Sequence, residues 1–166
     1  MKSAASLFPL CMVLAMVSGG VAVAQTDQAT SARLDALFGE HEPYQKFLTA
    51  LKAAVSADDK EAVAAMIAYP LETTIAGEQV TLESAGSFVQ RYDRLFTPAV
   101  VADVERQTYA TLFAAAEGVM IDDGEIWFSG VCSDQACSEA TIRIIAVNPT
   151  AGEPRAPSDQ PSGADR

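Results

Sequence analysis

Two cysteines near the C-terminal end have the spacing that most clearly indicates chemistry. Cys132 and Cys137 enclose the short polar segment 133–136. If they face each other across the mouth of a hairpin, their Cα atoms lie about 4.5–5.5 Å apart, which suits a disulfide. A redox-active pair is usually closer, as in C-x-x-C, and a metal site needs further ligands that the neighbouring sequence does not supply. The spacing therefore predicts a structural disulfide between Cys132 and Cys137.

Histidine chemistry has little support in this sequence. His41 is the only histidine, and it stands between Glu40 and Glu42 just before Pro43. A catalytic base needs a partner and a pocket, so we interpret His41 as a solvated loop residue. The sequence also lacks a glycine-rich phosphate loop, a G-x-S-x-G elbow and an H-E-x-x-H motif. These absences point away from phosphoryl transfer, from serine hydrolysis and from histidine-rich metal sites.

An acidic run at 122–125, Asp-Asp-Gly-Glu, has two interpretations. Its carboxylates suit calcium, but the run lacks the alternating ligands of a calcium-binding loop. Asp-Gly is also the strongest short-range signal for a hairpin turn, so we predict a turn. The acidic run at 58–61 similarly predicts a helix start, with Asp58 as N-cap. The sequence predicts no metal site and no cofactor.

Three aromatic residues are the candidates for a pocket or an interface. Tyr69, Tyr92 and Trp127 each combine an apolar body with a hydrogen-bonding tip. Ordinary membership of the core is the alternative for all three. No residue is predicted to be catalytic, but an enzyme built on this chain would use Asp103 or Asp93 as the base and Tyr92 as the acid.

The N-terminal residues have the pattern of a secretion signal. Lys2 gives a positive start, residues 7–17 form an apolar run, and Ala22-Val23-Ala24 precedes Gln25 as a small-x-small cleavage site. The apolar run is too short to span a bilayer. We expect cleavage before Gln25 and a periplasmic or secreted mature protein that is not embedded in a membrane, with an uncleaved anchor as the alternative.

The formal net charge of −11 limits the partners of the chain. A nucleic-acid-binding protein needs a cationic surface to displace counterions, so no nucleic-acid partner is expected. Anionic membrane surfaces are poor partners for the same reason. A basic protein or a cationic ligand is compatible with the charge, although acidity also serves solubility.

Composition and periodicity divide the chain into four parts. We expect a signal peptide at 1–24, a flexible segment at 25–42, one α+β domain at 43–148 and a disordered Pro-rich tail at 149–166. Within the domain, helical periodicity follows Pro43 and Asp58, and Ser84 and Thr97 begin later helices. Short strands are predicted at 71–75 and 79–82, followed by a strand-rich final third.

The predicted register of the final strands places apolar residues on both faces. The Asp-Gly turn pairs Val119 with Phe128, and Ile121 with Ile126, and it sets Met120 beside Trp127. Pairing Cys132 with Cys137 extends the next hairpin so that Trp127 lies opposite Ile142 and Phe128 opposite Thr141. Helices can cover one face of such a sheet, so we expect the other to mediate self-association, as a homodimer, or partner binding. The alternative is that the tail or the segment 98–113 covers it.

Several of these segments resemble a known superfamily. Phe47-Leu48 and the helix that follows, the small-Asp turn at 57–63, and Met66-Ile67 resemble the two opening helices of the NTF2-like superfamily, and residues 83–88 are similar to the start of its third helix. The resemblance implies a SnoaL-like or cystatin-like α+β cone, in which N-terminal helices pack on a curved antiparallel sheet around a cavity. Members of the superfamily include isomerases, dehydratases and non-catalytic binding modules.

Together these observations favour an exported, non-catalytic domain that binds a small molecule or a protein. Two alternatives remain open. One is a cavity enzyme of the isomerase or dehydratase type, and the other is a periplasmic inhibitor or immunity protein, for which acidity suits a basic target. Convergence of a carboxylate and a tyrosine in a closed cavity would favour the enzyme, whereas a filled interior would favour the binding module.

Overall fold

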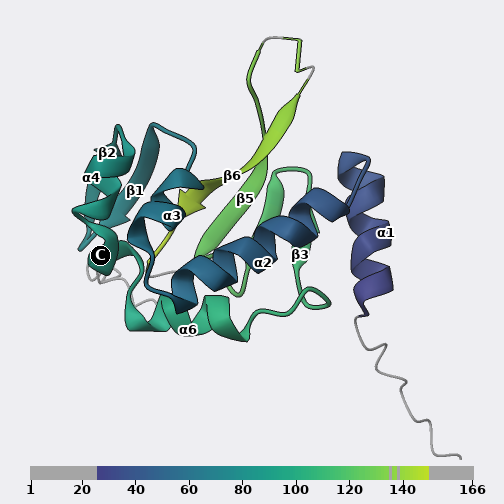
Figure 1. The fold of residues 1–166 in the computed structure, drawn as a ribbon, viewed down its shortest axis with the longest axis horizontal. Coiled ribbons are helices and arrows are strands. Elements are labelled where there is room, and N and C mark those ends of the chain that lie inside the picture. The colour runs from purple at the N-terminus through teal and green to yellow at the C-terminus, as the bar shows by residue number, and fades with distance from the viewer. Residues whose placement is uncertain (1–25, 135, 138, 150–166) are drawn as a thin grey trace, which may run out of the picture.

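The computed structural model describes residues 26–149 apart from residues 135 and 138 (Figure 1). The predicted signal peptide lies outside the described residues, as does the predicted tail beyond Pro149. The helices are α1 (Asp27–Phe38), α2 (Glu42–Ser56), α3 (Lys60–Ala65), α4 (Ala85–Val89), α5 (Tyr92–Leu95) and α6 (Pro98–Arg106). The strands are β1 (Leu71–Ile75), β2 (Glu78–Leu82), β3 (Phe113–Ala115), β4 (Gly118–Ile121), β5 (Ile126–Cys132) and β6 (Ala140–Val147). No helix within the described residues is long and apolar enough to cross a membrane.

The strands form two antiparallel sheets. β1 and β2 make a hairpin, and the larger sheet has the order β3-β4-β5-β6, so each strand pairs with its neighbour in sequence. An isolated bridge joins Ile67, just after α3, to Ile144 of β6. The larger sheet is open rather than closed into a barrel. The predicted α+β class, with helices packed on an antiparallel sheet, is confirmed.

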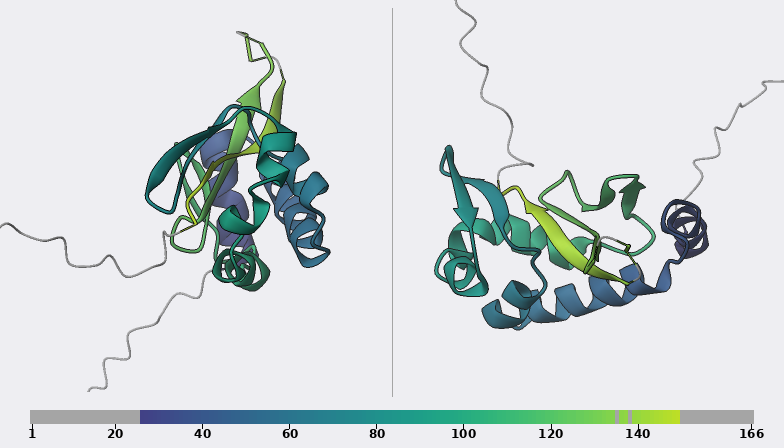
Figure 2. Two further views of the ribbon diagram at one scale, coloured as in Figure 1. Left: turned by 90° about the vertical axis from the view of Figure 1, so that its left-hand side faces the viewer. Right: turned by 90° about the horizontal axis from the view of Figure 1, so that it is seen from above.

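The main core lies between α2 and the larger sheet, and the views in Figure 2 show α2 along one face of that sheet. Phe47 of α2 stacks on Phe128 of β5, with 4.9 Å between ring centroids. Val119, Phe128 and Ile144 form a row across three strands and are fully buried. Burying a large apolar side chain contributes about 1.5–3 kcal/mol, so this row and the apolar stripe of α2 supply much of the stability.

The prediction of a flexible segment at 25–42 is wrong, because α1 is a docked helix. The side chain of Thr26 caps it by accepting a hydrogen bond from the Ala29 amide. Leu34 is fully buried, and the Thr30 hydroxyl donates to the Ala110 carbonyl at 3.0 Å. The polar composition of the segment hid this contact, since one leucine and a long-range hydrogen bond leave almost no periodic signal.

The start of α3 also differs from the prediction. Asp59, not Asp58, is the N-cap, and its carboxylate accepts a hydrogen bond from the Ala62 amide at 2.9 Å. Asp58 instead adopts a positive φ of 49°. The reason is that α2 continues to Ser56, so the chain needs one left-handed residue to reverse direction before α3 begins. The predicted cap of α4 is confirmed, since the Ser84 side chain accepts from the Ser87 amide.

The β4–β5 hairpin has the predicted register, but the β5–β6 hairpin does not. Val119 pairs with Phe128, Ile121 with Ile126 and Met120 with Trp127, as predicted. In the last hairpin, however, Trp127 pairs with Ala146 rather than Ile142, and Phe128 pairs with Ile144 rather than Thr141. Two features cause this shift: the ladder ends at Cys132 and Ala140, which leaves Cys137 inside the loop, and a bulge lies between Trp127 and Phe128.

Candidate functional site

Tyr92 lies in the core, although it was a candidate pocket residue. It is only 2% exposed, its ring stacks on Phe96 at 4.9 Å between centroids, and Phe88 contacts it edge-on. Within the described part of the chain, no hydrogen-bond partner reaches its hydroxyl. Burial, and then the charges of Asp58 and Asp93, raise the pKa of Tyr92 to about 12. The hydroxyl is therefore poorly placed to give a proton to a ligand.

The two acids considered as bases do not converge on Tyr92. The Asp93 side chain is 81% exposed and forms an ion pair with Lys60 at 2.6 Å. Asp103 lies on α6 and faces a hollow whose lining does not include Tyr92. Asp103 therefore lies apart from Tyr92, whereas Asp93 is linked to it only through Lys60, whose Nζ lies 5.2 Å from the centroid of the Tyr92 ring.

Tyr69 is half-buried beside a shallow hollow. Its hydroxyl donates to the Ala64 carbonyl at 2.9 Å, and burial raises its pKa to about 12. The hollow has a volume of about 550 Å³ and includes Glu83, Ser84 and Arg143 in its lining. Because the tyrosine proton already has an internal acceptor, Tyr69 supports the junction of α3 with β1 more than it offers a group to a ligand.

Trp127 lies on the face of the larger sheet opposite α2. The pairing places Phe113, Met120, Trp127 and Ala146 in one row across the four strands. Phe113 is 47% exposed, and its ring meets Trp127 edge-on at 6.5 Å. Ile145, the bulged residue of β6, is 37% exposed. We call Phe113, Met120 and Trp127 of that row, together with the neighbouring Ile145, the outer apolar row.

Charge is distributed unevenly around the outer apolar row. Between Arg106 and Arg143 the sequence has no lysine or arginine. That stretch forms β3, β4 and β5 and their connections. Its acidic residues are Glu117, Asp122, Asp123, Glu125, Asp134 and Glu139. An apolar surface on a uniformly acidic segment favours a cationic partner over an anionic one.

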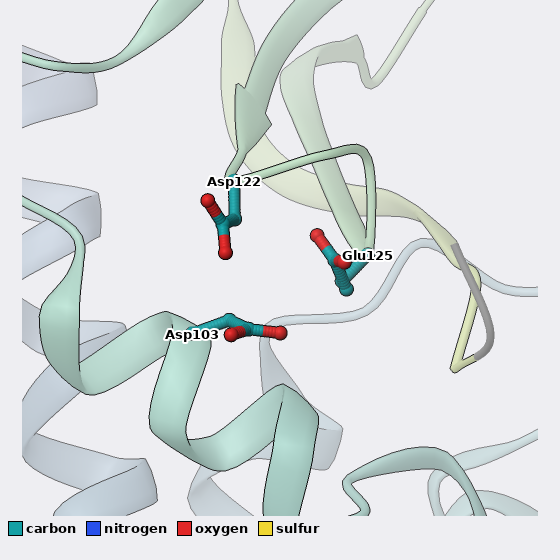
Figure 3. A group of neighbouring side chains, drawn as sticks. All are labelled: Asp103, Asp122 and Glu125. Carbon is teal, nitrogen blue, oxygen red and sulfur yellow. The ribbon is translucent and has the colours of Figure 1, made fainter. Parts of the chain in front are cut away.

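A second constellation joins α6 to the turn between β4 and β5. Asp103, Asp122 and Glu125 each direct a carboxylate toward a shared space (Figure 3). One oxygen from each lies within 4.8 Å of the others. Thr97 caps α6 and Pro98 occupies its first turn, which sets the helix orientation, while Asp122 has a positive φ of 46° that folds the turn toward α6. This is the group of described residues whose geometry could hold a metal ion.

Neighbouring groups neutralise the negative charges of the three carboxylates unequally. The Arg106 guanidinium donates to Asp103 at 2.6 Å and to Asp122 at 2.8 Å. Glu125 is only 2% exposed, and no partner among the described residues reaches its Oε2. Burial, and then the charges of Asp103 and Asp122, raise the pKa of Glu125. Burial and repulsion from Asp103 likewise raise the pKa of Asp122, although Arg106 opposes them.

Sequence reasoning identified the parts of this cluster but missed their assembly. The run 122–125 is a turn, as predicted, whereas the sequence suggests Asp103 only as the base of the alternative enzyme. Gln107, 6% exposed, joins the two: its Oε1 accepts from the Asp122 amide at 2.9 Å. A contact between a helix end and a later turn has no local signal, so only the long-range packing reveals the cluster.

The predicted cysteine pair and His41 occupy peripheral positions. Cys132 and Cys137 lie at disulfide-bonding distance, with their Cα atoms 4.8 Å apart. The His41 Nδ1 lies 2.8 Å from a carboxylate oxygen of Asp35, so this histidine is a half-buried ion-pair or hydrogen-bond partner that links α1 to the start of α2. Neither feature contributes to the carboxylate cluster or to the outer apolar row.

Comparison with known proteins gives no relative on which to base a function. No protein-family model matches the chain, and neither a curated protein nor a solved structure matches it. The NTF2-like resemblance therefore stays a prediction. Function has to be argued from the chemistry of the described residues.

Proposed function

We propose that this chain is an exported, non-catalytic interaction domain whose outer apolar row binds a basic protein. The observation that carries the proposal is the row itself. Phe113 and Ile145 are exposed, and the strand register places them on the sheet face opposite α2. Exposed apolar side chains gathered on one face commonly mark an interface, and aromatic residues supply the strongest contacts there.

The charge of the chain favours a basic protein over a second copy. The segment 107–142, which forms most of the face, has acidic residues and no basic ones. Two copies would bring like charges together, which costs free energy at low ionic strength. A cationic partner would instead be attracted by the acidic residues of this segment. The inhibitor or immunity-protein alternative is one form of this proposal, because such a protein would use its acidity against a basic target.

Two features support a binding module over a cavity enzyme. Tyr92 is packed in the core, Asp103 lines a separate hollow, and the Asp93 carboxylate is exposed and paired with Lys60. Export is supported by the signal pattern at 1–24 and by a cysteine pair of the kind that is retained in oxidising compartments. The proposal places the mature protein in the periplasm or outside the cell.

A photo-cross-linking phenylalanine analogue at position 113 tests the proposal in the native host. The same analogue at position 78, on the separate sheet formed by β1 and β2, is the matched control. We expect an adduct with a basic protein from position 113 only. That protein, purified separately, should bind the wild-type chain more weakly at 0.5 M than at 0.05 M salt, because the Debye length falls from about 14 Å to about 4 Å between these concentrations.

The affinity of a Phe113→Ser variant completes the test. Because Phe113 is already half exposed, the variant should fold normally and bind at least about tenfold more weakly, the loss of about 1.4 kcal/mol expected for an aromatic contact residue. An adduct with a second copy of this chain would overturn the basic-protein proposal in favour of a homodimer. Unchanged affinity of Phe113→Ser would show that the outer apolar row is not the interface.

A further inference from the structure

The buried carboxylate of Glu125 is the least explained charged group in the described structure. It is 2% exposed, and its Oε2 is buried without a hydrogen-bond partner among the described residues. A buried charge without compensation is costly, and proteins usually pair such a group or use it to coordinate a metal. Backbone amides of Asp123 and Glu125 offset part of this cost, but the carboxylates of Asp103 and Asp122, which Glu125 faces (Figure 3), add further negative charge.

From this geometry we infer that Asp103, Asp122 and Glu125 form a divalent-cation site fitted to calcium. The three side chains come from α6 and from the β4–β5 turn, and one carboxylate oxygen of each lies within 4.8 Å of the others. An ion about 2.3–2.6 Å from each oxygen fits between groups at that separation. An ion in this site would neutralise part of the negative charge that Glu125 shares with Asp103 and Asp122.

The donor atoms select the kind of ion. All three ligands are carboxylates, and oxygen-only sites suit calcium, magnesium or manganese rather than zinc or copper, which prefer nitrogen and sulfur. Calcium tolerates irregular geometry and a variable number of waters, whereas magnesium demands a near-ideal octahedron and loses water reluctantly. Three carboxylates at the edge of an open turn therefore fit calcium best.

An ion can reach the site from solvent. The carboxylates line a surface hollow of about 290 Å³, which Ala99, Val100, Arg106, Asp123 and Pro149 also line. This volume leaves room for waters that complete the coordination shell. Glu125 forms the buried floor of the hollow, while the Asp122 side chain is 42% exposed at its edge.

Arg106 is the internal competitor of the ion. Its guanidinium holds Asp103 and Asp122 together, but it makes no contact with Glu125 in the described structure. Its side chain is 63% exposed, so it can turn into solvent at little cost. A dication delivers twice the charge and reaches all three carboxylates. Because one arginine offsets part of the negative charge, we expect the weak affinity of extracellular calcium sites, with Kd about 10⁻⁴ to 10⁻³ M.

Titration calorimetry and thermal unfolding of the chelator-treated protein test this inference. At pH 7.5 we expect one calcium ion per chain and a melting temperature that rises with calcium concentration, as linkage requires. Magnesium should bind at least about tenfold more weakly, since the site lacks a rigid octahedral frame. Absence of both a binding isotherm and a melting shift at 10 mM calcium, at least about ten times the expected Kd, would overturn the inference.

Two variants locate the ion. Glu125→Gln should lower the calcium affinity at least tenfold, whereas Glu117→Gln, the same change at an exposed position in the β3–β4 turn, should leave the affinity unchanged. Should Glu125→Gln fold poorly, Asp103→Asn reports on the same site from α6. Equal calcium affinity in the wild type and in the cluster variants would place the ion elsewhere and refute the assignment.

Discussion

Removing the hydroxyl of Tyr92 tests most directly whether this residue is a core group or a catalytic acid. The hydroxyl is buried without a partner among the described residues. An unpaired buried hydroxyl costs about 1–3 kcal/mol, and Tyr92→Phe removes that cost while it keeps the ring contacts with Phe88 and Phe96. We expect Tyr92→Phe to raise the free energy of unfolding by about 1 kcal/mol, at the low end because the cavity left behind offsets part of the gain.

Tyr69→Phe is the matched comparison, because it removes the same atom from a hydroxyl that has a partner. The Tyr69 hydroxyl donates to the Ala64 carbonyl at 2.9 Å. That carbonyl also accepts from the Ile67 amide at 3.3 Å, so it keeps one partner after the substitution. The expected loss is that of one ordinary hydrogen bond, about 1 kcal/mol. The two variants should thus move stability in opposite directions, with about 2 kcal/mol between them.

Urea unfolding followed by circular dichroism measures this difference. The denaturant dependence of a small domain is about 1–3 kcal/mol per molar urea, so each variant should move the midpoint by about 0.3–1 M. The sign for Tyr92→Phe is the decisive result. A midpoint lowered as much as that of Tyr69→Phe would refute our reasoning, because it would mean that the Tyr92 hydroxyl makes a stabilising contact.

Three further changes have definite expected outcomes. Because burial raises the folded-state pKa of Glu125, protonation of this side chain favours the folded state, and that stabilisation is lost as the pH rises through the pKa. In chelator, the free energy of unfolding of Glu125→Gln should therefore exceed that of the wild type by a margin that grows from about pH 4 to pH 7 in urea titrations. Cys132→Ser should lower the free energy of unfolding by about 2 kcal/mol without abolishing the fold, and thiol labelling of unreduced wild type should find no free Cys132 or Cys137. Gly118→Ala should lower the free energy of unfolding by more than about 1 kcal/mol, because Gly118 has a φ of +147° and an added Cβ would lie 2.8 Å from the Phe128 carbonyl oxygen. Unchanged thermal stability of Gly118→Ala would contradict that geometry.

The parts of the fold that sequence predicts well are those set by neighbouring residues. The Asp-Gly turn fixes the β4–β5 register because a short turn leaves few ways to pair the flanking strands. The Ser84 and Thr97 caps are also local, since each side chain accepts from an amide three residues later. Where the determinant lies within one turn of the chain, residue type and spacing were sufficient.

The errors arise where the determinant is distant or is an added residue. Helix α1 is held by Leu34 and by a hydrogen bond to Ala110, a partner 80 residues away in sequence. The β5–β6 register differs from the prediction by three residues at Phe128, and the bulge that adds Ile145 to β6 shifts Trp127 by one residue more, which alternation cannot reveal. The three-residue shift comes from the assumption that Cys132 pairs directly with Cys137, because a disulfide also forms within a loop and need not mark the last strand pair.

The β4–β5 turn connects the two surfaces to which we assign functions. On one side of the turn Glu125 faces the carboxylate cluster, and on the other side Trp127 and Met120 belong to the outer apolar row. An added Cβ on Gly124, whose φ is +108°, would lie 3.3 Å from the Trp127 indole nitrogen and 3.4 Å from the Met120 sulfur. The turn must therefore stay tight for Trp127 to lie as it does. The same turn sets the position of Glu125, so we expect an ion that orders the cluster to order one edge of the outer apolar row as well. Ion binding would then raise the affinity of the row for its protein partner, and partner binding would raise the affinity for the ion by the same factor.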